Sequence, residues 1–189
     1  MDEVERIAAD AAGGDPLAAA ALVRATQSDV WRLCAALGDR GSADDLTQET
    51  YLRAFGSLHR FEHRASVRTW LLAIARRVCA DAVRSRRRRR ITLVRDSADL
   101  EALSARSGGP ADTVAEGATV IDLLSRLDPD RREAFVLTQL LGLPYAEAAE
   151  VVGCPVGTIR SRVARARADL VASLSGVKDD DTKGDAAHA

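Results

Sequence analysis

Apolar residues recur three and four positions apart along most of the chain, and no stretch alternates strictly in the manner of a half-buried β-strand. This pattern predicts an all-α protein. Two helices also have a start signal, because Asp15–Pro16 and Asp128–Pro129 each join a capping side chain to a proline at the first helical position. The predicted helices cover residues 17–37, 67–88, 117–126, 130–141, 144–152 and 156–174, and one more begins at Ala43.

Residues 91–116 break this pattern, since Ser, Asp, Gly and Ala mix there around the sequence SGGP without a clear period. Such a composition is typical of a linker. We therefore expect two small helical domains joined by a flexible linker. The expected divisions are an N-terminal extension (1–14), a first domain (15–90), the linker (91–116), a second domain (117–175) and a disordered acidic tail (176–189).

Charge is balanced in total but uneven in place. The 189 residues include 27 basic and 28 acidic side chains, yet arginines gather at 84–90 and 160–167. Blocks of positive charge favour an anionic polymer or surface as partner. The three cysteines form no CxxC pair, and the pattern predicts neither a secretory signal nor an apolar stretch long enough to span a bilayer. We expect a cytoplasmic protein with no cofactor, metal or membrane partner.

The segment YAEAAEVVGCPVGTIRSRV, residues 145–163, fits a helix-turn-helix. Ala149 is small where two helices must cross, and Gly153 suits the left-handed turn between them. Ile159 follows as the apolar plug of the second helix. The segment therefore predicts a module that binds duplex DNA.

The second helix of this motif has one face to bury and one to expose. At about 100° per residue, its apolar residues form a single stripe: Ile159, Val163, Ala166, Leu170 and Leu174. Small residues and one arginine point the opposite way: Ser161, Ala164, Arg165 and Ala168. Arg160 and Arg167 lie on one flank, and Thr158 and Arg162 on the other. This face fits a major groove; the alternative is a solvated basic helix whose arginines pair with acidic neighbours.

The helix predicted over 67–88 buries a stripe of Val67, Leu71, Ile74 and Val78. Trp70, Arg77 and Arg84 share another line, and Arg76 is expected to be exposed opposite the core. Arginines beside an aromatic ring can follow a single nucleic-acid strand. Two alternatives stay open: Trp70 is a core residue, and Arg86–Arg90 form a solvated helix end.

The sequence DDLTQET presents Asp44, Asp45, Gln48 and Glu49 on one acidic face. Such a face suits a basic protein partner and not DNA. An ordinary surface helix is the alternative.

Taken together, these motifs resemble the extracytoplasmic-function (ECF) class of bacterial RNA polymerase sigma factors, most nearly its sigma-C type. DDLTQETYLRAF looks like region 2.2, RTWLLAIARRVCADAVR like regions 2.3–2.4, and LLGLPYAEAAEVVGCPVGTIRSRVARARADL like region 4. The resemblance spans about 17–90 and 116–174. It implies a sigma region 2 domain and a sigma region 4 domain with the helix-turn-helix.

The resemblance implies a role for each candidate residue. Base reading in the −35 element falls to Arg160, Ser161 and Arg165, and phosphate contacts to Thr158, Arg162 and Arg167. The melted −10 element would meet Phe61, Ser66, Trp70, Arg76, Arg77 and Arg84. The β′ clamp helices of core polymerase would meet Asp45, Gln48, Glu49 and Leu52. The resemblance also implies contacts with the β flap of core polymerase, with promoter DNA and with a possible anti-sigma factor. It implies no small-molecule substrate.

The implied function is that of a promoter-specificity subunit that recognises the −35 and −10 elements, aids promoter melting and is not an enzyme. The main alternative is a stand-alone helix-turn-helix regulator. A metalloprotein using His59 and His63, or an anti-sigma adaptor, would be further alternatives. One hypothesis for the free protein is that the acidic face at 44–49 docks against arginines of the second domain and hides the DNA surfaces.

Overall fold

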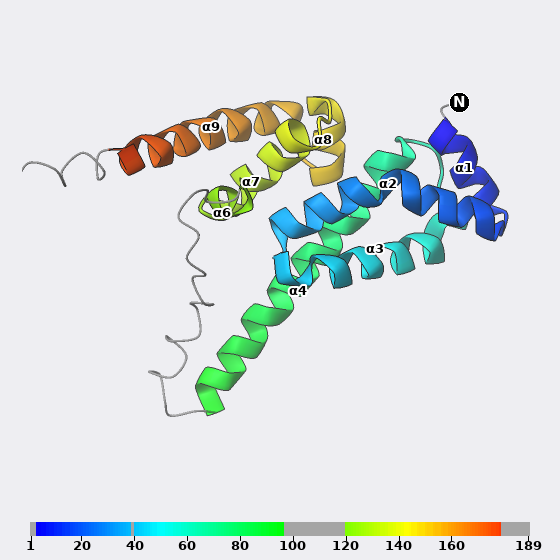
Figure 1. Ribbon diagram of the computed structural model, residues 1–189, viewed down its shortest axis with the longest axis horizontal. Helices are drawn as coiled ribbons and strands as arrows, with labels where there is room; N and C mark the ends of the chain where they lie inside the picture. Colours follow the sequence, from blue (N-terminus) through cyan, green and yellow to red (C-terminus); the bar gives the residue numbers. More distant parts are fainter. Residues whose placement is uncertain (1–2, 39, 97–119, 179–189) are drawn as a thin grey trace, which may run out of the picture.

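The computed structural model describes residues 3–38, 40–96 and 120–178, and within these ranges it contains helices and no β-strand. The all-α prediction is confirmed. The first module contains α1 (Glu3–Ala12), α2 (Pro16–Leu37), α3 (Ala43–Ser57) and α4 (Val67–Asp96), with 3-10 turns η1 (Arg40–Ser42) and η2 (Leu58–Arg60). The second contains α6 (Val120–Ser125), α7 (Pro129–Phe135), a π-helical turn η3 (Val136–Leu140), α8 (Tyr145–Val152) and α9 (Val156–Lys178) (Figure 1).

Both predicted caps are present. Asp15 Oδ1 accepts the backbone N–H of Leu17 at 2.8 Å, with Pro16 in the first helical turn. Asp128 Oδ1 accepts the N–H of Asp130 at 3.0 Å in the same way. Each aspartate satisfies a donor that the helix cannot satisfy itself, so both helix starts are encoded locally.

The core of the first module lies between α2, α3 and α4. The predicted stripe of α4 is buried, with Val67, Leu71, Ile74 and Val78 at most 8% exposed. Two free cysteines, Cys34 of α2 and Cys79 of α4, are buried in the same core. Their mutual hydrogen bond and the burial of the thiol raise the pKa of Cys79, and the same hydrogen bond lowers the pKa of Cys34.

The helix α1 was not predicted, since residues 1–14 were expected only to extend the chain. Its apolar positions Val4, Ile7, Ala8 and Ala11 pack against the core, and Ala8 is 1% exposed. The three- and four-residue spacing of these positions is the signal that sequence reasoning overlooked. The helix α1 is therefore a structural part of the first module.

Two helices run further than predicted. The helix α4 continues beyond Arg88 to Asp96, so the first residues of the expected linker are helical. Arginine has a high intrinsic helix propensity, which explains why the basic run extends the helix. The helix α9 continues to Lys178, and Leu174 is 51% exposed, which contradicts its expected burial. The rest of the linker, 97–116, and the tail from 179 lie outside the described residues.

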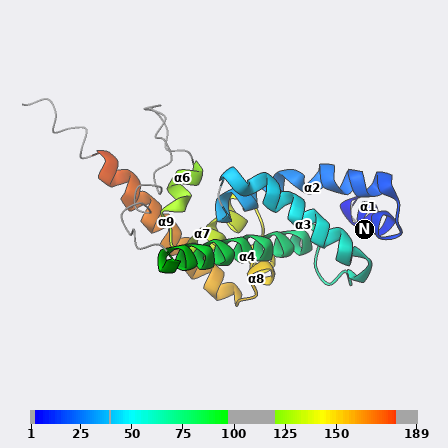
Figure 2. The same ribbon diagram turned by 90° about the horizontal axis from the view of Figure 1, so that it is seen from below.

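The second module packs on the first with α8 alongside α4 (Figures 1 and 2). The C-terminal end of α4 projects away from this contact (Figure 1). Over the described ranges, no helix combines the length and apolar character needed to cross a lipid bilayer.

Candidate nucleic-acid interface

The helix-turn-helix of the second module has the predicted turn. Gly153 ends α8 with φ 77° and ψ 42°, a left-handed conformation that an L side chain adopts only with strain. The N–H groups of Gly153 and Cys154 both donate to the carbonyl of Ala149, at 2.8 and 3.1 Å. Ile159 is fully buried. This geometry fixes the angle at which α9 leaves the turn.

Burial of one side of α9 exposes the other. Ile159, Val163 and Ala166 are at most 2% exposed. The predicted outward face is exposed: Ser161, Ala164, Arg165 and Ala168. Across the described ranges, the exposed Arg160 and Arg165 have no hydrogen-bond or ion-pair partner, so both guanidinium groups are available to a ligand.

The flanks of α9 are bound within the module. Arg162 forms an ion pair with Asp130, and Arg167 donates to Gln139 Oε1 at 2.6 Å. The carbonyl of Thr158 accepts a hydrogen bond from Ser161 Oγ at 3.0 Å. The side chains of Arg162 and Arg167 are thus already held in place, and Arg162 must exchange Asp130 for a phosphate if it binds DNA.

In the first module, an aromatic cluster lies where the loop after η2 meets α4. The rings of Phe61 and Trp70 are 5.0 Å apart between centroids, and Phe61 lies 4.6 Å from the ring of His63. Phe61 and Trp70 line an open cavity of about 300 Å³, which Glu150 of α8 also lines from the second module. Ser66 caps α4, since its Oγ accepts the N–H of Thr69 at 3.1 Å.

The expected exposure of Arg76 is wrong. Its side chain is 31% exposed, and its Nε donates to Glu133 Oε1 of α7 at 2.5 Å. Glu133 is 11% exposed at the side chain, so the pair is largely shielded from water. Sequence reasoning missed Glu133, because its partner lies in the other module. Arg77 is exposed, and no hydrogen bond or ion pair occupies it within the described residues.

Further bonds hold the two modules together beside this ion pair. Arg68 Nη2 donates to the carbonyl of Leu141 at 2.5 Å, and Thr69 Oγ1 donates to Glu147 Oε2 at 2.8 Å. Arg76 and Arg84 line a cavity of about 530 Å³ whose other wall includes Pro129 and Glu133 of α7. The second module therefore covers the candidate −10 face at Arg76, while Ser66, Arg77, Arg84 and the outward face of α9 stay exposed.

The expected docking of the acidic face on the second module is also wrong. Asp44 accepts a hydrogen bond from Trp31 Nε1 at 2.8 Å, within the first module. Asp45, Gln48 and Leu52 are exposed, and Leu52 keeps 70% of its surface in solvent. A carboxylate, an amide and an apolar side chain therefore share one open surface of α3.

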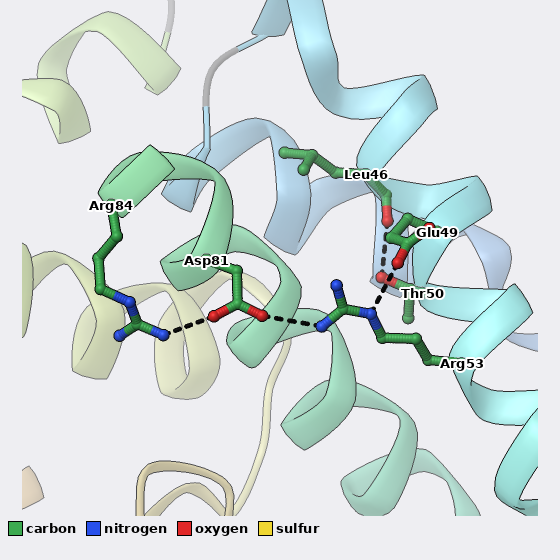
Figure 3. Close-up of polar contacts among 6 residues, drawn as sticks. All are labelled: Leu46, Glu49, Thr50, Arg53, Asp81 and Arg84. Atoms are coloured by element: carbon green, nitrogen blue, oxygen red, sulfur yellow. Dashed lines mark hydrogen bonds and ion pairs between the residues drawn. The ribbon is translucent and has the colours of Figure 1, made fainter. Parts of the chain in front are cut away.

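A chain of four charges runs from this surface to α4, as Figure 3 shows. Arg53 bridges Glu49 at 2.7 Å and Asp81 at 2.8 Å, and Asp81 also bonds Arg84 at 2.5 Å. Hydrogen bonds from the two guanidinium groups hold the pKa of Asp81 below its ordinary value, and the bond from Arg53 has the larger effect. The candidate polymerase residue Glu49 is thus connected to the candidate DNA residue Arg84.

The two histidines of the loop region do not form a metal site with each other. His59 Nε2 accepts a hydrogen bond from Arg60, and His63 contacts Glu5. In the part of the chain that the structure describes, no group of three His, Cys, Asp or Glu side chains could hold a metal ion.

Comparison with known proteins matches both modules to one family. The family model for Sigma-70 region 2 matches residues 22–89, and that for Sigma-70, region 4 matches residues 118–170. The ECF RNA polymerase sigma factor SigC of Mycobacterium tuberculosis is 53% identical over 172 residues, which cover 90% of this chain and 91% of the relative. The sigma factor CnrH of Cupriavidus metallidurans is 36% identical over 138 residues, covering 69% and 72% of the two chains.

Solved structures give the same family. CnrH in complex with the cytosolic domain of CnrY aligns with a TM-score of 0.69 at 29% identity, over 93% of this chain and 99% of that one. The sigma factor RpoE of Bartonella quintana, in complex with the anti-sigma factor NepR, aligns with a TM-score of 0.60 at 28% identity, over 81% and 94%. The chain belongs to the ECF family of RNA polymerase sigma factors.

Proposed function

We propose that residues 15–90 form the domain that binds core polymerase and the −10 element, that 91–116 link the domains, and that 117–175 form the domain that binds the −35 element. As a sigma factor, the chain gives the polymerase its promoter specificity and catalyses no reaction itself. The observation that carries this assignment of roles is the outward face of α9. Arg165 is exposed there, on the side of the helix opposite the buried apolar stripe. We place this activity in the cytoplasm.

Recognition of the −35 duplex falls to Arg160, Ser161 and Arg165. Their exposure on one face, beside Ala164 and Ala168, lets α9 approach the groove floor closely. An arginine can bond the O6 and N7 atoms of guanine with both arms, and each such contact discriminates between bases by about 1–3 kcal/mol. Thr158, Arg162 and Arg167 would hold the flanking phosphates and fix the register of the helix.

Recognition of the opened −10 strand falls to the loop after η2 and the adjacent turns of α4. Phe61 and Trp70 offer aromatic faces on which an unstacked base can lie, with Ser66 at the helix cap. Arg76, Arg77 and Arg84 would follow the strand phosphates. Arg77 is already exposed for this role, whereas Arg76 must first leave Glu133.

Polymerase binding falls to the open surface of α3, where Asp45, Gln48, Glu49 and Leu52 would meet the β′ clamp helices. Leu52 supplies the apolar area and the carboxylates supply attraction to basic residues. The second domain would meet the β flap. An anti-sigma factor is a further expected partner, because the similar sigma factor RpoE of Bartonella quintana forms a complex with the anti-sigma factor NepR.

Binding to polymerase explains how two weak DNA modules act together. Once core polymerase fixes their spacing, binding of one module raises the effective concentration of the other. Unstacking and unpairing a base costs a few kcal/mol, and contacts to the flipped base and to the strand offset that cost.

Run-off transcription with core polymerase on a promoter library tests the proposal. Arg165→Ala should cost about 1–3 kcal/mol at one −35 base position and relax the preference there. Arg162→Ala serves as the matched control, since loss of a phosphate contact weakens all sequences alike. A stand-alone regulator would instead bind duplex DNA without polymerase and leave its start sites unchanged, and that outcome would refute the proposal.

A further inference from the structure

The N-terminal helix α1 reaches the loop that the proposed function assigns to the −10 strand. Glu5 accepts the backbone N–H of Val67, the first residue of α4, at 2.7 Å through Oε1. Its Oε2 lies 3.4 Å from Nδ1 of His63, in the middle of the loop. A single carboxylate from the start of the chain therefore holds two points of this loop.

The contact with Val67 completes the cap of α4. The first N–H groups of a helix have no partner within it, and a carboxylate there also interacts favourably with the helix dipole. Ser66 supplies the local cap, because its Oγ accepts the N–H of Thr69 at 3.1 Å. Glu5 supplies the complementary bond to an earlier N–H, as the glutamate of a capping box does, but from a different helix.

The contact with His63 holds a strained residue. His63 has φ 54°, and among the described residues it is the one non-glycine residue with a positive φ. Such a conformation costs on the order of 1–3 kcal/mol and persists where the surroundings hold it. The ring of His63 lies against Phe61, whose ring in turn lies against Trp70. Glu5 is thus connected through packed rings to the aromatic surface.

We propose that Glu5 is a positioning residue for promoter opening: it fixes the loop so that Phe61 and Trp70 present their rings to an unstacked base. This inference rests on the proposed function of the loop. The Glu5 side chain is 19% exposed and is shared between Val67 and His63, so it acts through the loop and not by touching DNA.

The test measures promoter opening by the reconstituted holoenzyme, with a fluorescent base analogue placed in the −10 element. Glu5→Ala should slow opening about five- to tenfold, the equivalent of one lost cap. The opening rate of Glu5→Gln should lie between those of the wild type and Glu5→Ala. The amide keeps an oxygen that accepts the N–H of Val67, but it loses the charge that faces His63. Asp10→Ala is the matched control, because Asp10 is an exposed acid of the same helix whose side chain has no partner in the described ranges.

Three further measurements separate positioning from stability. Affinity for core polymerase and for −35 duplex should stay at the wild-type value, and the −10 base preference of Glu5→Ala should broaden. Thermal unfolding is recorded for each variant, and opening is measured well below every midpoint. A lower midpoint with opening and base preference unchanged would overturn the inference, because Glu5 would then only stabilise the domain.

A loop variant distinguishes this failure from failure of the proposed function. If Phe61→Ala slows opening and Glu5→Ala does not, only the role of Glu5 is refuted. If neither variant affects opening, the assignment of the loop to the −10 strand is itself refuted. Should Glu5→Ala not fold, Glu5→Gln and His63→Ala carry the same test, and wild-type opening by both would overturn the inference.

Discussion

The ion pair between Arg76 and Glu133 should control access to the proposed −10 face in the free protein. Glu133→Gln keeps the size of the side chain and one acceptor oxygen, and it removes the charge. Because Arg76 stays charged, the variant keeps a charge-assisted hydrogen bond and loses only the attraction between two opposite charges. Both side chains are less than a third exposed, so solvent screens this attraction only in part. We expect the docked arrangement to lose about 1–1.5 kcal/mol, between the value of an exposed ion pair and that of a pair at an effective dielectric constant of about 20.

That loss shifts the ratio of separated to docked protein by about five- to tenfold. Where only separated molecules bind the strand, the apparent affinity rises by the same factor. Fluorescence anisotropy with a single-stranded −10 oligonucleotide and no polymerase measures this affinity. Binding to −35 duplex should change little, since the outward face of α9 is already exposed in the docked arrangement.

Asp169→Asn is the matched control for charge alone. Asp169 pairs with Arg131 within the second module at 2.6 Å, so its neutralisation adds the same charge to the protein and leaves the contact between modules intact. Small-angle scattering of the free variants gives an independent measure of separation. The reasoning is refuted if Glu133→Gln and Asp169→Asn bind the strand equally and scatter alike.

Three other outcomes test the fold and its electrostatics. The buried cysteine pair should resist iodoacetamide at pH 8 while the partly exposed Cys154 reacts, as peptide mass spectrometry would detect; rapid labelling of all three would contradict their burial. Asp81 should titrate below the ordinary aspartate value of about 3.9, so its contribution to stability is present above that value and is lost as pH falls through its own lower pKa. In NMR titrations, Arg53→Ala should raise that pKa, and an unchanged value would exclude the bridge. Gly153→Ala should lower the unfolding free energy by about 1–2 kcal/mol through its positive φ alone, since nothing lies within 4 Å of an added Cβ; an unchanged denaturant midpoint would refute this cost.

The local features of this fold could be predicted from sequence. The period of α9 placed Ile159 inside and Arg165 outside, because both positions follow from the helical repeat alone. The Asp–Pro pairs marked two helix starts for the same reason, since a cap involves residues only two or three positions apart. The turn at Gly153 likewise depends on the conformational freedom of one residue.

Contacts between distant segments could not be predicted in this way. Arg76 was expected in solvent, because nothing near it in sequence reveals that Glu133 lies opposite. The bond from Glu5 to Val67 joins the first helix to the fourth, and no local pattern encodes it. The predicted burial of Leu174 was wrong for the opposite reason. The apolar repeat continues along α9 beyond the part of the helix that packs on the rest of the module.

Glu49, Arg53, Asp81 and Arg84 alternate in charge and form a row of ion pairs from α3 to α4. A change of charge at one end of this row therefore alters the electrostatic potential at the other. Under the proposed function, a cation on the polymerase would pair with Glu49 and leave Arg53 to Asp81 alone, so that Asp81 would attract Arg84 less. The Nη–H resonances of Arg84, whose Nη2 donates to Asp81, would report this change as core polymerase is added. Docking on one side of the domain would then loosen a guanidinium on the other, and no helix has to move.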